Sequence, residues 1–366
     1  METQMPRALI AAVGGVVSIW AMVGCRAPAR TSSPLYPWDR PGVLRVGLDA
    51  NPFANEAYSS HAVEARFRQA RDAGVNLIYI SPKWDEIETR PEQYKLNDLE
   101  YRIGESIREN LPAILHIRVI DTNQRAMPAD LMAKPFDAEE TSARLDRLLD
   151  SVLPRLQGRV KYFLVGNEID PYFRQHPDEV HAFATLVGRA SAHIRNSVPD
   201  AQISVSTTFD GLKDAGELRP ILDQTAFFAL TYYPMSADFV VRDPSTVEAD
   251  FPQIFRAAGA KRIFLQEVGY PTSPANGSSD DKQADFFSRV LDQVAANPGR
   301  FIGVNFNFMS DFSDSLVKSF TAYYRMPGAD RFGSFLKTLG MFDDQGRPKK
   351  SWGVFARKVR SLTVKT

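Results

Sequence analysis

The sequence predicts a single (β/α)8 barrel, the TIM-barrel fold, over residues 41–362. Eight short apolar runs alternate with segments of helical periodicity, which is typical of β-α units around a parallel sheet. Eight such units in one domain suit a closed barrel, since these barrels commonly contain ~200–400 residues. An open, doubly wound sheet would place a glycine-rich phosphate loop after its first strand. Here the first strand instead runs into Asp49-Ala50-Asn51-Pro52.

The eight strands are predicted from runs rich in apolar, β-branched and aromatic residues. They lie at 43–50, 75–82, 113–121, 160–168, 202–209, 226–234, 262–270 and 301–309. Between them, apolar side chains recur at spacings of three and four, which indicates amphipathic helices. We expect helices at 62–73, 96–109, 178–198 and 280–296, and another that contains the stripe Leu145, Leu148, Leu149 and Val152.

The charge balance narrows the class of partner. The chain has 44 basic and 44 acidic residues, so its formal net charge is zero. No charge excess favours nucleic acid or an acidic surface as the ligand. We therefore expect a neutral partner such as a carbohydrate, and no nucleic acid.

The N-terminal segment has the pattern of a bacterial lipoprotein signal. Arg7 precedes the apolar run 8–25, and small residues lie near the end of that run, as at a signal-peptide cleavage site. The run ends at Cys25, and Met22-Val23-Gly24-Cys25 resembles a lipobox. We expect a signal peptide at 1–24, lipidation of Cys25, and a Pro- and Ser-rich tether at 25–40. The protein would then be extracytoplasmic and attached to a membrane by its lipid anchor. The alternative is an uncleaved N-terminal membrane helix.

Two glutamates follow apolar strands, in the part of a barrel where working residues gather. RVKYFLVGNEID places Asn167 and Glu168 at the end of the fourth strand, and RIFLQEVGYPTS places Glu267 near the end of the seventh. A carboxylate in such a position is costly unless it is paired or has a task. Glycoside hydrolysis needs two carboxyl groups, one protonated to act as the acid and one ionised.

These motifs resemble clan A of the glycoside hydrolases, the 4/7 superfamily. In that clan, Asn-Glu ends the fourth strand and a second glutamate lies on the seventh. The segments SPKWDEIETRPEQYKLNDLEYRIGESI (81–107) and GMFDDQGRPKKSWGVF (340–355) also resemble clan members. Within the clan, the chain most resembles the endo-galactanase and β-1,3-glucanase branches. The resemblance implies a retaining glycoside hydrolase in which Glu168 is the acid/base and Glu267 the nucleophile.

Further site residues follow from position. The resemblance implies that Asn167 binds the sugar 2-hydroxyl. It also implies that a sixth-strand aromatic hydroxyl contacts the nucleophile, with Tyr233 favoured over Tyr232. Arg118 is expected to face the site and keep a carboxylate ionised, although a structural ion pair is the alternative. Rings that follow strands two, seven and eight are candidate platforms for sugar stacking: Trp84, Tyr270 and Phe308.

Other chemistries find little support. The five histidines show no metal-ligand spacing, and we expect neither a metal nor a cofactor. No Gly-x-Ser-x-Gly elbow is present. The predicted function is therefore the hydrolysis of β-glycosidic bonds by double displacement. Two alternatives stay open: a non-catalytic carbohydrate-binding barrel lipoprotein, and a glucan transglycosylase that uses the same residues.

Overall fold

The computed structural model describes residues 38, 43–57, 59–325 and 329–363. The predicted signal peptide, Cys25 and nearly all of the tether lie outside these residues. Within the described ranges, no helix combines the length and apolar character needed to cross a bilayer.

All eight predicted strands form, and they build a barrel of parallel strands. In chain order these are Val46–Leu48 (β1), Ile78–Ile80 (β2), Ala113–Asp121 (β5), Val160–Asn167 (β7), Gln202–Ser204 with Ser206–Thr208 (β8 and β9), Phe228–Tyr232 (β10), Ile263–Val268 (β11) and Phe301–Phe306 (β12). One arc runs β2-β5-β7-β8 and the other β9-β10-β11-β12-β1. Only Val205 separates β8 from β9. The arcs meet again where Asn76 N–H and Leu77 N–H donate to the Val46 carbonyl at 2.9 and 3.2 Å. The predicted closed barrel is therefore confirmed.

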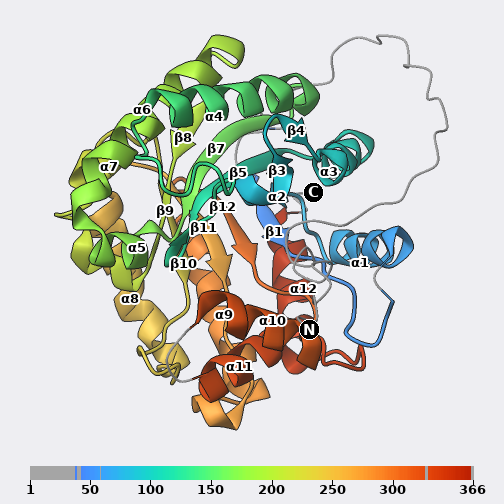
Figure 1. The fold of residues 1–366 in the computed structure, drawn as a ribbon. Coiled ribbons are helices and arrows are strands. Elements are labelled where there is room, and N and C mark those ends of the chain that lie inside the picture. Colours follow the sequence, from blue (N-terminus) through green and yellow to red (C-terminus); the bar gives the residue numbers. More distant parts are fainter. Residues whose placement is uncertain (1–37, 39–42, 58, 326–328, 364–366) are drawn as a thin grey trace, which may run out of the picture.

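Helices surround the strands, as Figure 1 shows. This outer layer contains Ser60–Asp72 (α1), Asn97–Arg108 (α3), Glu139–Val152 (α4), Val180–Ser197 (α6), Arg219–Leu222 (α7), Val247–Ala258 (α8), Asp280–Ala296 (α9) and Lys350–Thr363 (α12). The ends of α1 illustrate how local sequence sets these bounds. The Ser59 hydroxyl accepts from the Ala62 N–H at 3.2 Å, and Gly74, with φ +97°, follows its last turn.

The connections carry smaller elements. These are Trp84–Ile87 (α2), Glu88–Arg90 (β3), Gln93–Tyr94 (β4), Gln124–Arg125 (β6), Ile169–Gln175 (α5), Asp314–Tyr324 (α10) and Ala329–Lys337 (α11). Short 3-10 turns occur at Leu153–Leu156, Pro177–Glu179, Asp210–Asp214, Pro244–Thr246 and Pro274–Asn276.

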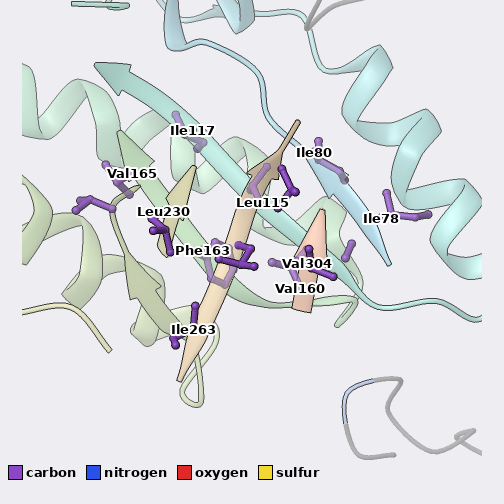
Figure 2. Packing of buried hydrophobic residues seen from close by; sticks show 14 of the residues in the cluster. Ile78, Ile80, Leu115, Ile117, Val160, Phe163, Val165, Leu230, Ile263 and Val304 are labelled. Atoms are coloured by element: carbon purple, nitrogen blue, oxygen red, sulfur yellow. The ribbon is translucent and has the colours of Figure 1, made fainter. Parts of the chain in front are cut away.

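Strand alternation divides the core into two parts. Figure 2 shows buried side chains of the main core, among them Ile78, Leu115, Phe163, Leu230 and Val304. Residues one position away in sequence pack into a second apolar cluster inside the barrel: Leu77, Ile114, Tyr162, Leu164, Phe227, Ala229, Phe264 and Ile302. Successive side chains of a strand point to opposite faces, which explains the two clusters.

Above this apolar floor, the barrel interior becomes polar. The Tyr79 hydroxyl lies 2.6 Å from His116 Nδ1, one alternation above Leu77 and Ile114. A Cβ atom on Gly47 would lie 2.4 Å from Asn305 Oδ1, so these two positions also face each other inside. Polarity therefore increases toward the C-terminal ends of the strands, which we call the barrel mouth.

Candidate active site

Glu168 and Glu267 come from opposite arcs of the barrel and meet at its mouth. Glu168 directly follows β7, and Glu267 lies within β11. Thr231 of β10 links them, because it is the register partner of Glu267 and its hydroxyl donates to Glu168 Oε1 at 2.6 Å. Neighbouring strands lie about 4.8 Å apart, so this link places both carboxyl groups in one small region.

Glu168 is held by two hydroxyl groups. Thr122 Oγ1 donates to its Oε2 at 2.7 Å, while Thr231 contacts the other oxygen. The backbone N–H of Glu168 donates to Ser206 Oγ at 3.0 Å. Burial, followed by the negative charge of Glu267, raises the pKa of Glu168 to about 8. The side chain is thus suited to hold a proton at neutral pH.

Glu267 has a different set of partners. The Tyr233 hydroxyl donates to its Oε2 at 2.8 Å, and Gln266 Nε2 donates to its Oε1 at 3.2 Å. Burial raises the pKa of Glu267, whereas the positive charge of Arg118 and the Tyr233 hydroxyl lower it. The two carboxyl groups therefore differ in what stabilises their ionised forms, and the cation favours ionisation of Glu267.

Arg118 combines both roles considered from the sequence. Its Nε donates to Ser81 Oγ at 2.8 Å, and its Nη1 lies 3.4 Å from Asp121 Oδ1. It forms an ion pair with Asp121 and also acts electrostatically on Glu267.

Asn167 is buried and bonded at both ends of its amide. Its Nδ2 donates to Asp121 Oδ1 at 3.0 Å, and its Oδ1 accepts from Gln266 Nε2 at 2.7 Å and from Ser206 Oγ at 3.4 Å. This network fixes the residue immediately before Glu168. The contact between Asn167 and a sugar hydroxyl stays a prediction.

Two predicted aromatic platforms are wrong. Trp84 is fully buried, and its Nε1 donates to Glu88 Oε2 at 2.8 Å. Tyr270 is also fully buried, stacks on Phe286 at 4.8 Å, and donates to the Arg242 carbonyl at 2.7 Å. Both rings belong to the packing of the barrel, because nearness to a strand end does not determine which way a ring turns.

Phe308 is also largely covered. Its exposed fraction is 9%, and its ring centroid lies 4.6 Å from that of Phe312. It belongs to an aromatic cluster with Phe332 and Phe335 rather than to a free surface. Stacking of a sugar on Phe308 is therefore not supported.

Several residues of this site were missed by the sequence analysis. Asn307 Nδ2 donates to the Tyr233 hydroxyl at 3.2 Å, and Thr122, Thr231 and Gln266 contact the glutamates. Alternation could have found Thr231, which lies two residues before Tyr233. No local sequence signal marks Thr122. Its backbone, with a φ of +58° in the turn after β5, directs its side chain toward Glu168.

Comparison with known proteins shows what this architecture resembles. No family model matches the chain, and no curated protein matches it. GH5_18 from Streptomyces cattleya, solved with GlcNAc, superposes with a TM-score of 0.68 and 17% identity over 88% of this chain and 81% of that one. The exo-β-1,4-mannosidase Op5Man5 from Opitutaceae bacterium strain TAV5 superposes with a TM-score of 0.65 and 19% identity, over 88% of this chain and 60% of that one. Xylanase 10B from Thermotoga maritima superposes with a TM-score of 0.58 and 15% identity, over 90% of this chain and 98% of that one.

At identities below 20%, these similarities establish the fold alone. The chain shares the (β/α)8 barrel of these proteins.

Proposed function

We propose that this chain is a clan A retaining glycoside hydrolase that cleaves β-glycosidic bonds in poly- or oligosaccharides. The observation that carries the proposal is the pairing of Glu168 and Glu267 through Thr231 at the barrel mouth. The raised pKa of Glu168 suits a proton donor, and the proximity of Arg118 suits Glu267 as the ionised partner.

The two carboxyl groups would act in two displacements. In the first, Glu267 attacks the anomeric carbon, the bond to the leaving oxygen breaks, and Glu168 donates its proton to that oxygen. In the second, Glu168 removes a proton from water, the water oxygen attacks the same carbon, and the bond to Glu267 breaks. This sequence retains the anomeric configuration and requires carboxyl groups ~5–5.5 Å apart.

The substrate proposal rests on the structural neighbours. These neighbours include GH5_18 proteins solved with GlcNAc and with Manβ1-4GlcNAc, an exo-β-1,4-mannosidase and a xylanase. The sequence motifs favour the endo-galactanase or β-1,3-glucanase branches. A substrate panel should therefore include β-mannosides, β-xylosides, β-galactosides and β-glucosides.

The site of action is proposed from the N-terminal sequence. Lipidation of Cys25 would attach the enzyme to a membrane on its extracytoplasmic side, where polymeric sugars are accessible. We expect labelled palmitate to be incorporated into the wild type and not into Cys25→Ser. Absence of label from the wild type would instead favour an uncleaved membrane helix.

The activity is tested with the full chain in detergent and p-nitrophenyl β-glycosides of mannose, glucose, galactose, xylose and N-acetylglucosamine. We expect Glu267→Ala to abolish turnover, and azide to restore part of the activity of Glu168→Ala by attacking the glycosyl-enzyme directly. Full activity in either variant would refute the assignment. Sugar binding without turnover would favour a non-catalytic barrel, and products dominated by sugar-to-sugar transfer would favour a transglycosylase.

A further inference from the structure

The hydrogen-bonding groups of the site are largely occupied by one another. Both carboxylate oxygens of Glu168 accept from threonine hydroxyls, and both oxygens of Glu267 accept from protein donors. The amide of Asn167 is bonded at both ends, and the Tyr233 hydroxyl both donates and accepts. A sugar ring carries several hydroxyls, and orienting it requires polar groups with unused capacity.

Asp49 is positioned to offer such capacity. It follows β1, where its N–H donates to the Phe306 carbonyl at 3.0 Å and its carbonyl accepts from the Met309 N–H at 2.8 Å. Gly47, two residues earlier, faces Asn305 inside the barrel. Alternation along the strand therefore directs the Asp49 side chain inward, one layer above Asn305 and at the level of the mouth.

Among the described residues, no donor forms a hydrogen bond with the Asp49 carboxylate, although the side chain is only partly exposed. Burial raises the pKa of Asp49, while the positive charges of Arg102 and Arg118 lower it. The charge of Asp49 in turn acts on Glu267 and raises the pKa of that group. Within the described part of the chain, the Asp49 carboxylate accepts no hydrogen bond, so it lacks part of the stabilisation that a bonded carboxylate has.

We propose that the Asp49 carboxylate accepts hydrogen bonds from hydroxyls of the sugar ring that becomes attached to Glu267. This inference rests on the proposed function and extends it to substrate recognition. β1 lies two strands from β11, about 10 Å around the barrel, so Asp49 faces the end of the ring remote from the anomeric carbon. A negative charge there favours a neutral sugar over a uronic acid.

A purely structural role would leave a different signature. If Asp49 only balanced the charges of Arg102 and Arg118, its removal would weaken folding or shift pH profiles. The effect of its removal on kcat/KM would then not depend on which hydroxyls the substrate carries. Deoxy substrates separate these two roles, because they delete the partner from the ligand side.

The experiment compares the best p-nitrophenyl glycoside of the panel with its 3-deoxy and 4-deoxy analogues, using the wild type, Asp49→Ala and Asp49→Asn. We expect the wild type to lose roughly ten- to hundredfold in kcat/KM on the analogue that lacks the bound hydroxyl. On the parent substrate, Asp49→Ala should have a kcat/KM lower than that of the wild type by a similar factor. Removing the bound hydroxyl from the substrate should then lower the kcat/KM of Asp49→Ala only a little further. Asp98→Ala is the matched control, because Asp98 pairs with Arg102 outside the barrel, and it should keep the wild-type response to deoxygenation.

The inference would be overturned if the Asp49 substitutions and the removal of either substrate hydroxyl lowered kcat/KM by independent factors that multiply. That conclusion would hold even if Glu168 and Glu267 prove essential. If the wild type binds sugar but shows no turnover, the proposed function fails. The same comparison is then made on dissociation constants of the methyl glycosides, measured by calorimetry. If removal of the hydroxyl then weakened binding by the same factor in the wild type and in Asp49→Ala, the role of Asp49 would be refuted.

Discussion

Removing the Tyr233 hydroxyl should change how Glu267 ionises while leaving the barrel intact. That hydroxyl donates to Glu267 Oε2 at 2.8 Å, and the ring packs edge-on to Phe335 at 5.5 Å. Tyr233→Phe keeps the ring contact and deletes the donor. A hydrogen bond to a charged group contributes about 1.5–3 kcal/mol. Loss of the Tyr233 donor should therefore make ionisation of Glu267 less favourable by about that amount and raise its pKa.

The assay is the pH dependence of kcat/KM on an aryl β-glycoside. Because Glu267 must be ionised to attack, its pKa sets the acidic limb of the profile. That limb should move to higher pH in Tyr233→Phe, and kcat/KM on it should fall roughly ten- to hundredfold. Tyr232→Phe is the matched control, since the Tyr232 hydroxyl donates to the buried Asp250 at 2.8 Å and not to the glutamates. A uniform loss of activity in Tyr233→Phe with an unmoved acidic limb would refute this reasoning.

Four further predictions follow from the contacts and burial described above. The wild-type kcat/KM should fall above a pH of about 8, where Glu168 loses its proton; continued activity at pH 10 would contradict its role as the acid. Because the pKa of Glu168 is raised, its protonated form contributes to the free energy of unfolding. This contribution is complete below the ordinary pKa of 4.5 and is lost as the pH rises through about 8. Glu168→Gln should therefore unfold at a higher temperature than the wild type at pH 9, and an equal or lower melting temperature would count against this. Thr231→Val should shift the basic limb upward, since the Thr231 hydroxyl lowers the pKa of Glu168, and a downward shift would be inconsistent. Trp84→Ala should lower the free energy of unfolding by about 3–5 kcal/mol in denaturant titrations, whereas a change below about 1 kcal/mol would mean that the ring is not core.

The sequence was sufficient for the barrel and for the placement of the two glutamates. Apolar runs mark strands that are buried on both faces, and the C-terminal ends of parallel strands meet at one edge. Glu168 and Glu267 therefore could be assigned to one region without knowledge of any contact. Tyr233 was named because the resemblance to clan A implies a sixth-strand aromatic hydroxyl beside the nucleophile, and the structure places its hydroxyl 2.8 Å from Glu267 Oε2.

The sequence was insufficient where side-chain direction decides the role. Trp84 and Tyr270 follow strands just as the glutamates do, yet both rings turn into the packing layer. Thr122 reaches Glu168 only because its backbone adopts a left-handed conformation in the turn after β5. Such local geometry depends on tertiary contacts, and neither periodicity nor composition records it.

The most direct test of the account is to trap the covalent sugar on the protein. A 2-deoxy-2-fluoro glycoside with a good leaving group should react once and then release its sugar slowly, because fluorine destabilises the positive charge that develops in both steps. Mass spectrometry of the digested protein should place the sugar on Glu267, and Glu267→Gln should carry none. A label on another residue would contradict the account, as would a protein that hydrolyses the unfluorinated substrate with inversion of configuration.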